Sequence, residues 1–83
     1  MIDKYKKNRI VVDPEIMVGK PIIKGTRITV ELILRLLAQG EKIEEILKAY
    51  PHLEREDIYA ALEYAGEIIE EEKVIPLGRV KYA

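Results

Sequence analysis

The chain has 83 residues, of which 48% are hydrophobic, a formal net charge of −1, and no cysteine. A chain of this length forms one domain, and the lack of cysteine excludes disulfides and thiolate metal sites. No apolar run approaches the ~20 residues that a membrane-spanning helix needs, and the basic start lacks the apolar middle of a signal peptide, so we expect a cytoplasmic protein without a membrane partner.

Charge is distributed unevenly along the chain. Residues 1–27 carry seven basic and three acidic side chains, whereas residues 28–83 carry seven basic and twelve acidic ones. Such a chain can bind an anion at one end and a cation, or a second copy of itself, at the other, although two solvated faces would give the same counts. A domain this small buries only about 60% of the surface of its unfolded chain, so we expect a homodimer or another partner to cover part of it. The abundance of Glu, Lys and Ile, with few amides, is typical of heat-adapted proteins.

The N-terminal third is predicted to form a basic arm followed by a β-hairpin. Residues 9–12 are a short β-branched run that ends at the turn signal Asp13-Pro14. Gly25 can adopt a positive φ, so we expect the chain to reverse there, between the apolar residues 22–23 and 28–30.

Residues 30–39 are predicted to form a buried helix that the rest of the chain packs against. Thr29 is a favoured N-cap residue, and Gly40 is favoured just after a helix end. A helix that is apolar on nearly every side is normally buried. Its polar positions are four residues apart and form one narrow stripe, in which the first two have the spacing of a favourable ion pair: Glu31, Arg35 and Gln39.

Two further helices are predicted between residues 42 and 69. The second starts near Lys42 with a poor N-cap and stops before Pro51. The third follows a short turn, and Gly66 weakens it by about 1 kcal/mol relative to alanine, so that an end or a bend is expected there. Apolar spacing predicts the inner face of this third helix as Ile58, Ala61, Leu62, Ala65 and Ile69.

The predicted fold class is therefore mainly α. It is a three-helix, helix-turn-helix-like bundle with a short N-terminal β-ribbon, in a single domain over residues 1–83. The arm and hairpin occupy residues 1–30, the three-helix core residues 30–69, and a C-terminal tail residues 70–83. The same outline serves domains that never touch DNA, so the fold alone does not decide the function.

One block of the sequence resembles a known family. The run G-K-P-I-I-K-G-T-R-I at residues 19–28, with V-D-P-E-I at residues 12–16 before it, is similar to the signature of the domain-of-unknown-function family 433. The similarity extends over roughly residues 10–65. The resemblance implies a VapB-type antitoxin of a toxin–antitoxin pair: a homodimer that binds a PIN-like ribonuclease toxin, with operator DNA as a second ligand.

The sequence offers little for an enzyme. A P-loop needs G-x-x-x-x-G-K-[ST], but Pro14 stands at the first glycine position and Pro21 replaces the Ser or Thr. Asp13 and Glu15 are too few carboxylates for a nuclease metal site, and the lone His52 is more typical of a turn than of a catalytic base. We therefore expect no enzymatic activity, cofactor, metal or small-molecule substrate.

Candidate DNA contacts come mainly from the basic N-terminal third. Between residues 54 and 67 the third helix carries one basic and five acidic side chains, which repel a duplex. Cations of the hairpin can hold phosphates only if the hairpin lies beside that helix. Each cation has an alternative interpretation as a local ion pair or a solvated side chain. The candidates are Lys20, Lys24, Arg27 and Arg55.

Candidate protein contacts come from the acidic third helix and the tail. An RNA-cleaving toxin should be basic around its active site, so an acidic face would complement it. The apolar tail residues can anchor in a partner groove, or fold back on this chain or on a second copy. The candidates are Tyr59, Glu63, Glu67, Val74, Ile75 and Leu77. An antitoxin-like module is the first hypothesis; the alternatives are a stand-alone DNA-binding transcriptional regulator and a dimeric interaction domain that does not bind DNA.

Overall fold

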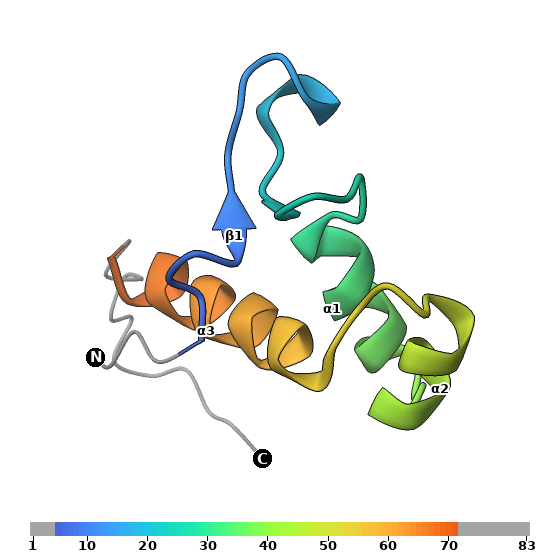
Figure 1. Cartoon of the computed structure of the whole chain (residues 1–83). Helices are drawn as coiled ribbons and strands as arrows, with labels where there is room; N and C mark the ends of the chain where they lie inside the picture. Colours follow the sequence, from blue (N-terminus) through green and yellow to red (C-terminus); the bar gives the residue numbers. More distant parts are fainter. Residues whose placement is uncertain (1–4, 72–83) are drawn as a thin grey trace, which may run out of the picture.

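The computed structural model describes residues 5–71, in which a small antiparallel sheet precedes three helices (Figure 1). The predicted mainly α fold with a short N-terminal β-ribbon is confirmed, and a short turn joins the second and third helices. The elements follow in the order β1 (Ile10–Val11), the 3-10 turn η1 (Met17–Gly19), β2 (Ile22–Ile23), α1 (Val30–Ala38), α2 (Ile43–Ala49) and α3 (Arg55–Glu71).

The β-ribbon is shorter than the sequence predicted. β1 pairs antiparallel with β2, so that Ile10 lies opposite Ile23, and the chain then reverses at Gly25 with a φ of +80°. Thr26 braces this reversal, because its Oγ1 donates to the carbonyl of Ile23 at 2.8 Å and accepts from the N–H of Ile28 at 2.9 Å. The returning chain makes a single bridge to β2, between Thr29 and Ile22, since Thr29 is also the N-cap of α1 and the helix begins at the next residue.

The connection between β1 and β2 projects away from the helices (Figure 1). It contains two non-glycine residues in the left-handed region, Met17 with a φ of 53° and Val18 with a φ of 58°. Val18 is 92% exposed, so this backbone conformation is not offset by burial of the side chain.

Both ends of α1 are set by the predicted capping residues. The Oγ1 of Thr29 accepts the N–H of Leu32 at 3.0 Å, which satisfies one of the unpaired donors of the first turn. At the other end Gly40 has a φ of +94° and donates to the carbonyl of Leu37 at 3.0 Å. The next N–H, of Glu41, donates to Leu36 at 3.1 Å, and the two bonds together form a Schellman motif.

The starts of α2 and α3 share one device that the sequence analysis missed. The backbone N–H of Lys42 donates to Oε1 of Glu45 at 2.7 Å, and the N–H of Glu54 donates to Oδ2 of Asp57 at 2.9 Å. In both helices the carboxylate of the third helical residue accepts a hydrogen bond from the backbone N–H of the residue just before the helix. The N-cap side chains are therefore poor, as predicted, but the third helical residue compensates for them.

The core contains one fully buried isoleucine from each helix: Ile33 of α1, Ile46 of α2 and Ile58 of α3. Buried side chains from β2 and the turn before α3 complete the cluster, among them Ile23 and Leu53. α1 packs against both other helices, as predicted, but α3 does so too and also contacts β1, so within residues 5–71 α1 is not the only centre of the fold. The prediction that α1 is buried on nearly every side is wrong, because four of its leucines are only half-buried: Leu32, Leu34, Leu36 and Leu37.

The predicted inner face of α3 is correct at Ile58 and Ala61 and wrong at two other positions. Leu62 is 45% exposed and Ile69 is 59% exposed. The buried stripe is rotated toward Asp57 and Ala60, because the N-terminal residues pack along that edge of the helix. Gly66 neither ends nor breaks α3, which continues to Glu71.

Replacing Ile33 by alanine should lower the free energy of unfolding by about 2–5 kcal/mol, because it removes three buried carbon atoms at the contact of all three helices. Urea denaturation followed by circular dichroism measures the loss. Ile69→Ala is the matched control: its side chain is mostly exposed, so it should cost less than about 1 kcal/mol. Equal losses in the two variants would contradict the assignment of Ile33 to the core.

Candidate functional site

Residues 5–9, the N-terminal arm, lie along the outer side of α3 (Figure 1). The N–H groups of Tyr5 and Lys6 both donate to Oε1 of Glu63, at 2.8 and 2.9 Å. Nζ of Lys6 lies 3.0 Å from Oε1 of Glu67, and the ring of Tyr5 packs on that of Tyr59 with centroids 5.1 Å apart. The helix residues predicted to bind a partner are thus brought together on one face, and the arm of the same chain contacts them.

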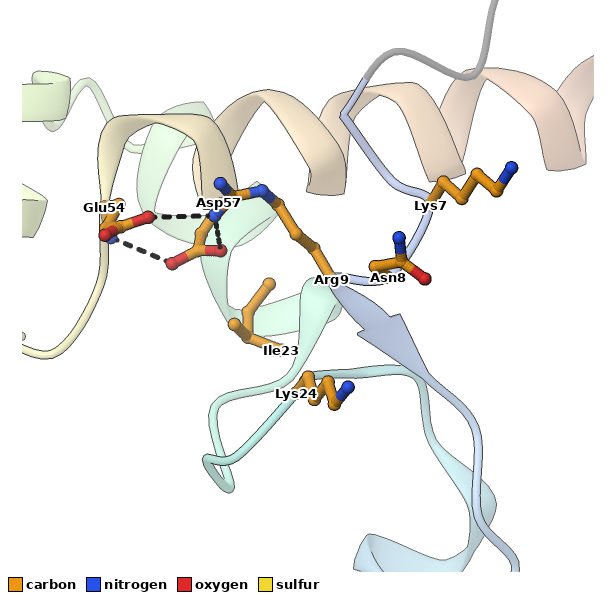
Figure 2. A pocket seen from close by; sticks show the side chains of 7 residues that line it. All are labelled: Lys7, Asn8, Arg9, Ile23, Lys24, Glu54 and Asp57. Carbon is orange, nitrogen blue, oxygen red and sulfur yellow. Dashed lines mark hydrogen bonds and ion pairs between the residues drawn. The ribbon is translucent and has the colours of Figure 1, made fainter.

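Arg9, at the end of the arm, is the main electrostatic link of the site. Its Nη1 donates to Oδ1 of Asp57 at 2.9 Å and to Oε1 of Glu54 at 3.0 Å (Figure 2). These hydrogen bonds, the one to Asp57 first, raise the pKa of Arg9 above its usual value. The Arg9 carbonyl also accepts the N–H of Lys24 at 2.8 Å, so one residue joins the arm, the β-ribbon and the start of α3.

Sequence analysis counted Arg9 only as part of the basic N-terminus and assigned it no site role. Its partners Glu54 and Asp57 lie 45 and 48 residues away, and no periodic pattern reports a contact over that separation. Acidic residues at the start of a helix gave no signal either, because the helix dipole alone already favours negative charge there.

The recess beside Arg9 places cations next to the start of α3 (Figure 2). Lys7, Asn8 and Lys24 line it together with Glu54 and Asp57. The side chains of Lys7 and Lys24 point away from the two carboxylates, which Arg9 already neutralises (Figure 2). The hairpin therefore does lie beside the third helix, which was the condition for its cations to support a duplex.

The four predicted DNA contacts fall into two classes. Lys20 pairs with Glu31 at 3.1 Å, and Arg55 pairs with Glu44 of α2 at 2.8 Å. The other two, Lys24 and Arg27, are exposed on either side of Gly25, and within residues 5–71 neither forms an ion pair.

An apolar surface runs along the outer and C-terminal part of α3. Leu62 lines a recess with Tyr5, Tyr59 and Gly66 beside the arm. Ile68 is 37% exposed and lines, with the more exposed Ile69, a groove between α3 and α1. The α1 side of that groove is formed by Pro21, Val30 and Leu34. The predicted anchors Val74, Ile75 and Leu77 lie outside the described residues.

Within residues 5–71, no group of three or more His, Cys, Asp or Glu side chains is arranged to hold a metal ion. In the same part of the chain, no helix combines the length and the apolar character needed to cross a membrane.

Breaking the Arg9–Asp57 contact should lower the free energy of unfolding by about 1–2 kcal/mol in either Arg9→Ala or Asp57→Asn, because it removes a partly buried charged hydrogen bond. Asparagine keeps an oxygen for the Glu54 N–H, so this change tests the charge. The double variant should cost less than the sum of the single ones, as urea denaturation can measure. Arg35→Ala, which breaks an exposed pair, is the control and should cost less. Additive losses would show that Arg9 and Asp57 act independently.

Acidification should remove a contribution to stability from Glu31 and Glu44. The hydrogen bond from Lys20 lowers the pKa of Glu31, and the hydrogen bond from Arg55 lowers the pKa of Glu44. The contribution is therefore complete above the ordinary glutamate pKa of about 4.3 and is lost as the pH falls through the lowered values. A Glu31→Gln, Glu44→Gln variant should melt below the wild type at pH 7, with a gap that closes toward pH 2. A gap that persisted at pH 2 would assign the effect to packing.

Comparison with known proteins places this geometry in a family. The profile of the family described as "Protein of unknown function (DUF433)" matches residues 10–65. An uncharacterised protein of Sinorhizobium fredii, y4eO, is 38% identical over 52 residues, which are 63% of this chain and 24% of that protein. An uncharacterised protein of Archaeoglobus fulgidus is 61% identical over 28 residues, which are 34% of this chain and 78% of that protein.

A solved structure agrees with both the sequence and the fold. The crystal structure of a DUF433 member protein from Anabaena variabilis is 33% identical, and it superposes with a TM-score of 0.72 over 81% of this chain and 66% of that one. The matches thus span about a quarter of the Sinorhizobium protein and about two thirds of the Anabaena chain. The family profile covers well over half of the residues of this chain, from β1 to the middle of α3. This chain therefore belongs to the DUF433 family.

Proposed function

We propose that this chain is a non-enzymatic, antitoxin-like module that binds and neutralises a PIN-like ribonuclease toxin through the exposed apolar residues of α3. One observation carries the proposal: α3 presents exposed apolar side chains, Leu62, Ile68 and Ile69, among acidic ones. Exposed apolar residues grouped on one element are characteristic of protein interfaces.

The charge of this surface favours a protein partner over a nucleic acid. Glu70 is exposed and follows Ile69 in sequence, and a duplex would be repelled by it. An enzyme that cleaves RNA needs cations around its substrate, so its surface would be attracted to this acidic face. A cytoplasmic homodimer is also part of this proposal.

Co-expression with the product of the neighbouring gene tests the proposal. The two proteins should purify as one complex, and growth inhibited by the neighbour alone should be restored. Ile68→Glu combined with Ile69→Glu should abolish both effects, because it places charge at the apolar contact. Val18→Glu is the matched control, since Val18 is also exposed but lies on the projecting β1–β2 connection. Absence of both a complex and growth rescue with the wild-type chain would reject the proposal.

A stand-alone DNA-binding regulator is the second candidate, and one observation favours it. Lys24 and Arg27 are exposed on the hairpin, and Lys7 and Lys24 line the recess at the start of α3. Duplex binding should then weaken with salt with a log–log slope near −0.9 per phosphate contacted. Replacing Lys24 and Arg27 by alanine should flatten that slope by about 1.8, since two contacts are lost. Lys48→Ala, an exposed change on α2, is the control.

An unchanged slope in the Lys24→Ala, Arg27→Ala variant would exclude the hairpin as the DNA contact. If the chain bound neither a duplex nor the neighbouring gene product, a dimeric interaction domain that does not bind DNA would remain as the explanation of its exposed apolar surface.

A further inference from the structure

The arm of residues 5–9 shows what kind of molecule the outer face of α3 recognises. Two backbone N–H groups of the arm donate to the carboxylate of Glu63, its lysine ammonium pairs with Glu67, and its tyrosine ring packs against Tyr59. A guanidinium on Asp57 and Glu54 completes the set. This face is therefore occupied by a peptide segment that supplies an aromatic residue, a lysine and an arginine in the order Tyr-Lys-x-x-Arg.

Part of this recognition does not depend on the sequence of the bound segment. The two bonds to Glu63 come from the main chain of Tyr5 and Lys6, and any non-proline residues could supply them. The remaining contacts select for positive charge and an aromatic ring. Another chain with the same features can satisfy the face equally well.

The arm is held by contacts that a competitor can replace. The Lys6–Glu67 and Arg9–Glu54 pairs are partly exposed, and such pairs contribute little individually. Asn8, with a φ of 70°, lies between the two groups of contacts, and the N–H groups of Arg9 and Ile10 turn back to the carbonyl of Lys6. The Lys6 carbonyl is thus tied to the start of β1, and the contacts that a competitor would replace on α3 are those of the Tyr5 ring, the Lys6 ammonium and the two backbone N–H groups.

The recess next to the arm would strengthen binding of a longer partner. Tyr5 covers one side of it, while Leu62 remains 45% exposed beside Tyr59 and Gly66. A partner segment that buried Leu62 as well would gain apolar contact that the arm does not make.

We propose that this face of α3 is the docking site for an extended, basic, aromatic-containing segment of a partner protein, and that Tyr5 and Lys6 occupy it as an intramolecular competitor while Arg9 stays bound to Asp57. This inference rests on the proposed function only in taking the partner to be a protein. The tethered arm acts at an effective concentration on the order of mM. A partner can bind only while the arm is away from the face, so its apparent affinity is the intrinsic affinity multiplied by the fraction of time that the face is open.

The test uses the chain's own segment as the probe. A fluorescein-labelled peptide of residues 5–12 is titrated with the full chain, and binding is measured by fluorescence anisotropy. A Tyr5→Ala, Lys6→Ala variant, in which the arm is weakened, should bind the peptide at least tenfold more tightly than the wild type. Adding Glu63→Gln and Glu67→Gln to that variant should abolish the gain. Lys7→Ala in the arm and Glu41→Gln, an exposed change between α1 and α2, are the controls and should leave the affinity unchanged within twofold.

Equal affinity of the wild type and the arm-weakened variant would overturn the inference, because the arm would then not compete. Undiminished binding after Glu63 and Glu67 are replaced would overturn it as well, since the peptide would bind elsewhere. If the arm-weakened variant does not fold, the peptide is added in mM excess to the ¹⁵N-labelled wild type, where it must shift the amide signals of Tyr5 and Lys6. Because no toxin is used, peptide binding without a toxin complex would reject the proposed function and leave the docking site standing.

Discussion

The carboxylate of Asp57 is the group on which the arrangement of the two halves of the chain depends. One of its oxygens accepts the N–H of Glu54 at the start of α3, and the other accepts from the guanidinium of Arg9. Asp57 is only 6% exposed, so removing Arg9 would leave a nearly buried charge with the backbone N–H of Glu54 but without its cation. Through this one side chain, the beginning of the third helix and the beginning of the β-ribbon are fixed relative to each other.

This link also joins the basic N-terminal part of the chain to its acidic third helix. The basic N-terminal arm and the acidic third helix meet: Lys6 pairs with Glu67 and Arg9 pairs with Asp57, whereas Glu70 of the helix stays exposed. What remains exposed is different from either half taken alone: a pair of cations at the hairpin, Lys24 and Arg27, and an apolar strip on α3. The residual surface therefore combines apolar and charged parts that neither half of the sequence shows alone.

Features that depend on neighbours in sequence could be predicted. The caps of α1 at Thr29 and Gly40, the reversal at Gly25 and the three helices all follow from local rules of backbone conformation and apolar spacing. The face of α3 could not be predicted correctly, because the position of Leu62 depends on residues 5–9, more than fifty positions away. The role of Arg9 was missed for the same reason. In the candidate site, the side chains that would meet on α3 could be named from sequence, whereas the segment that covers them could not.

The backbone of Val18 has a practical consequence for engineering this fold. A β-branched residue held in the left-handed region is strained by an amount on the order of 1–3 kcal/mol, and a side chain that is 92% exposed provides no compensating contact. Glycine or asparagine tolerates this conformation far better. The tip of the β1–β2 connection is accordingly a site where thermal tolerance can be increased without altering either the hairpin cations or the surface of α3.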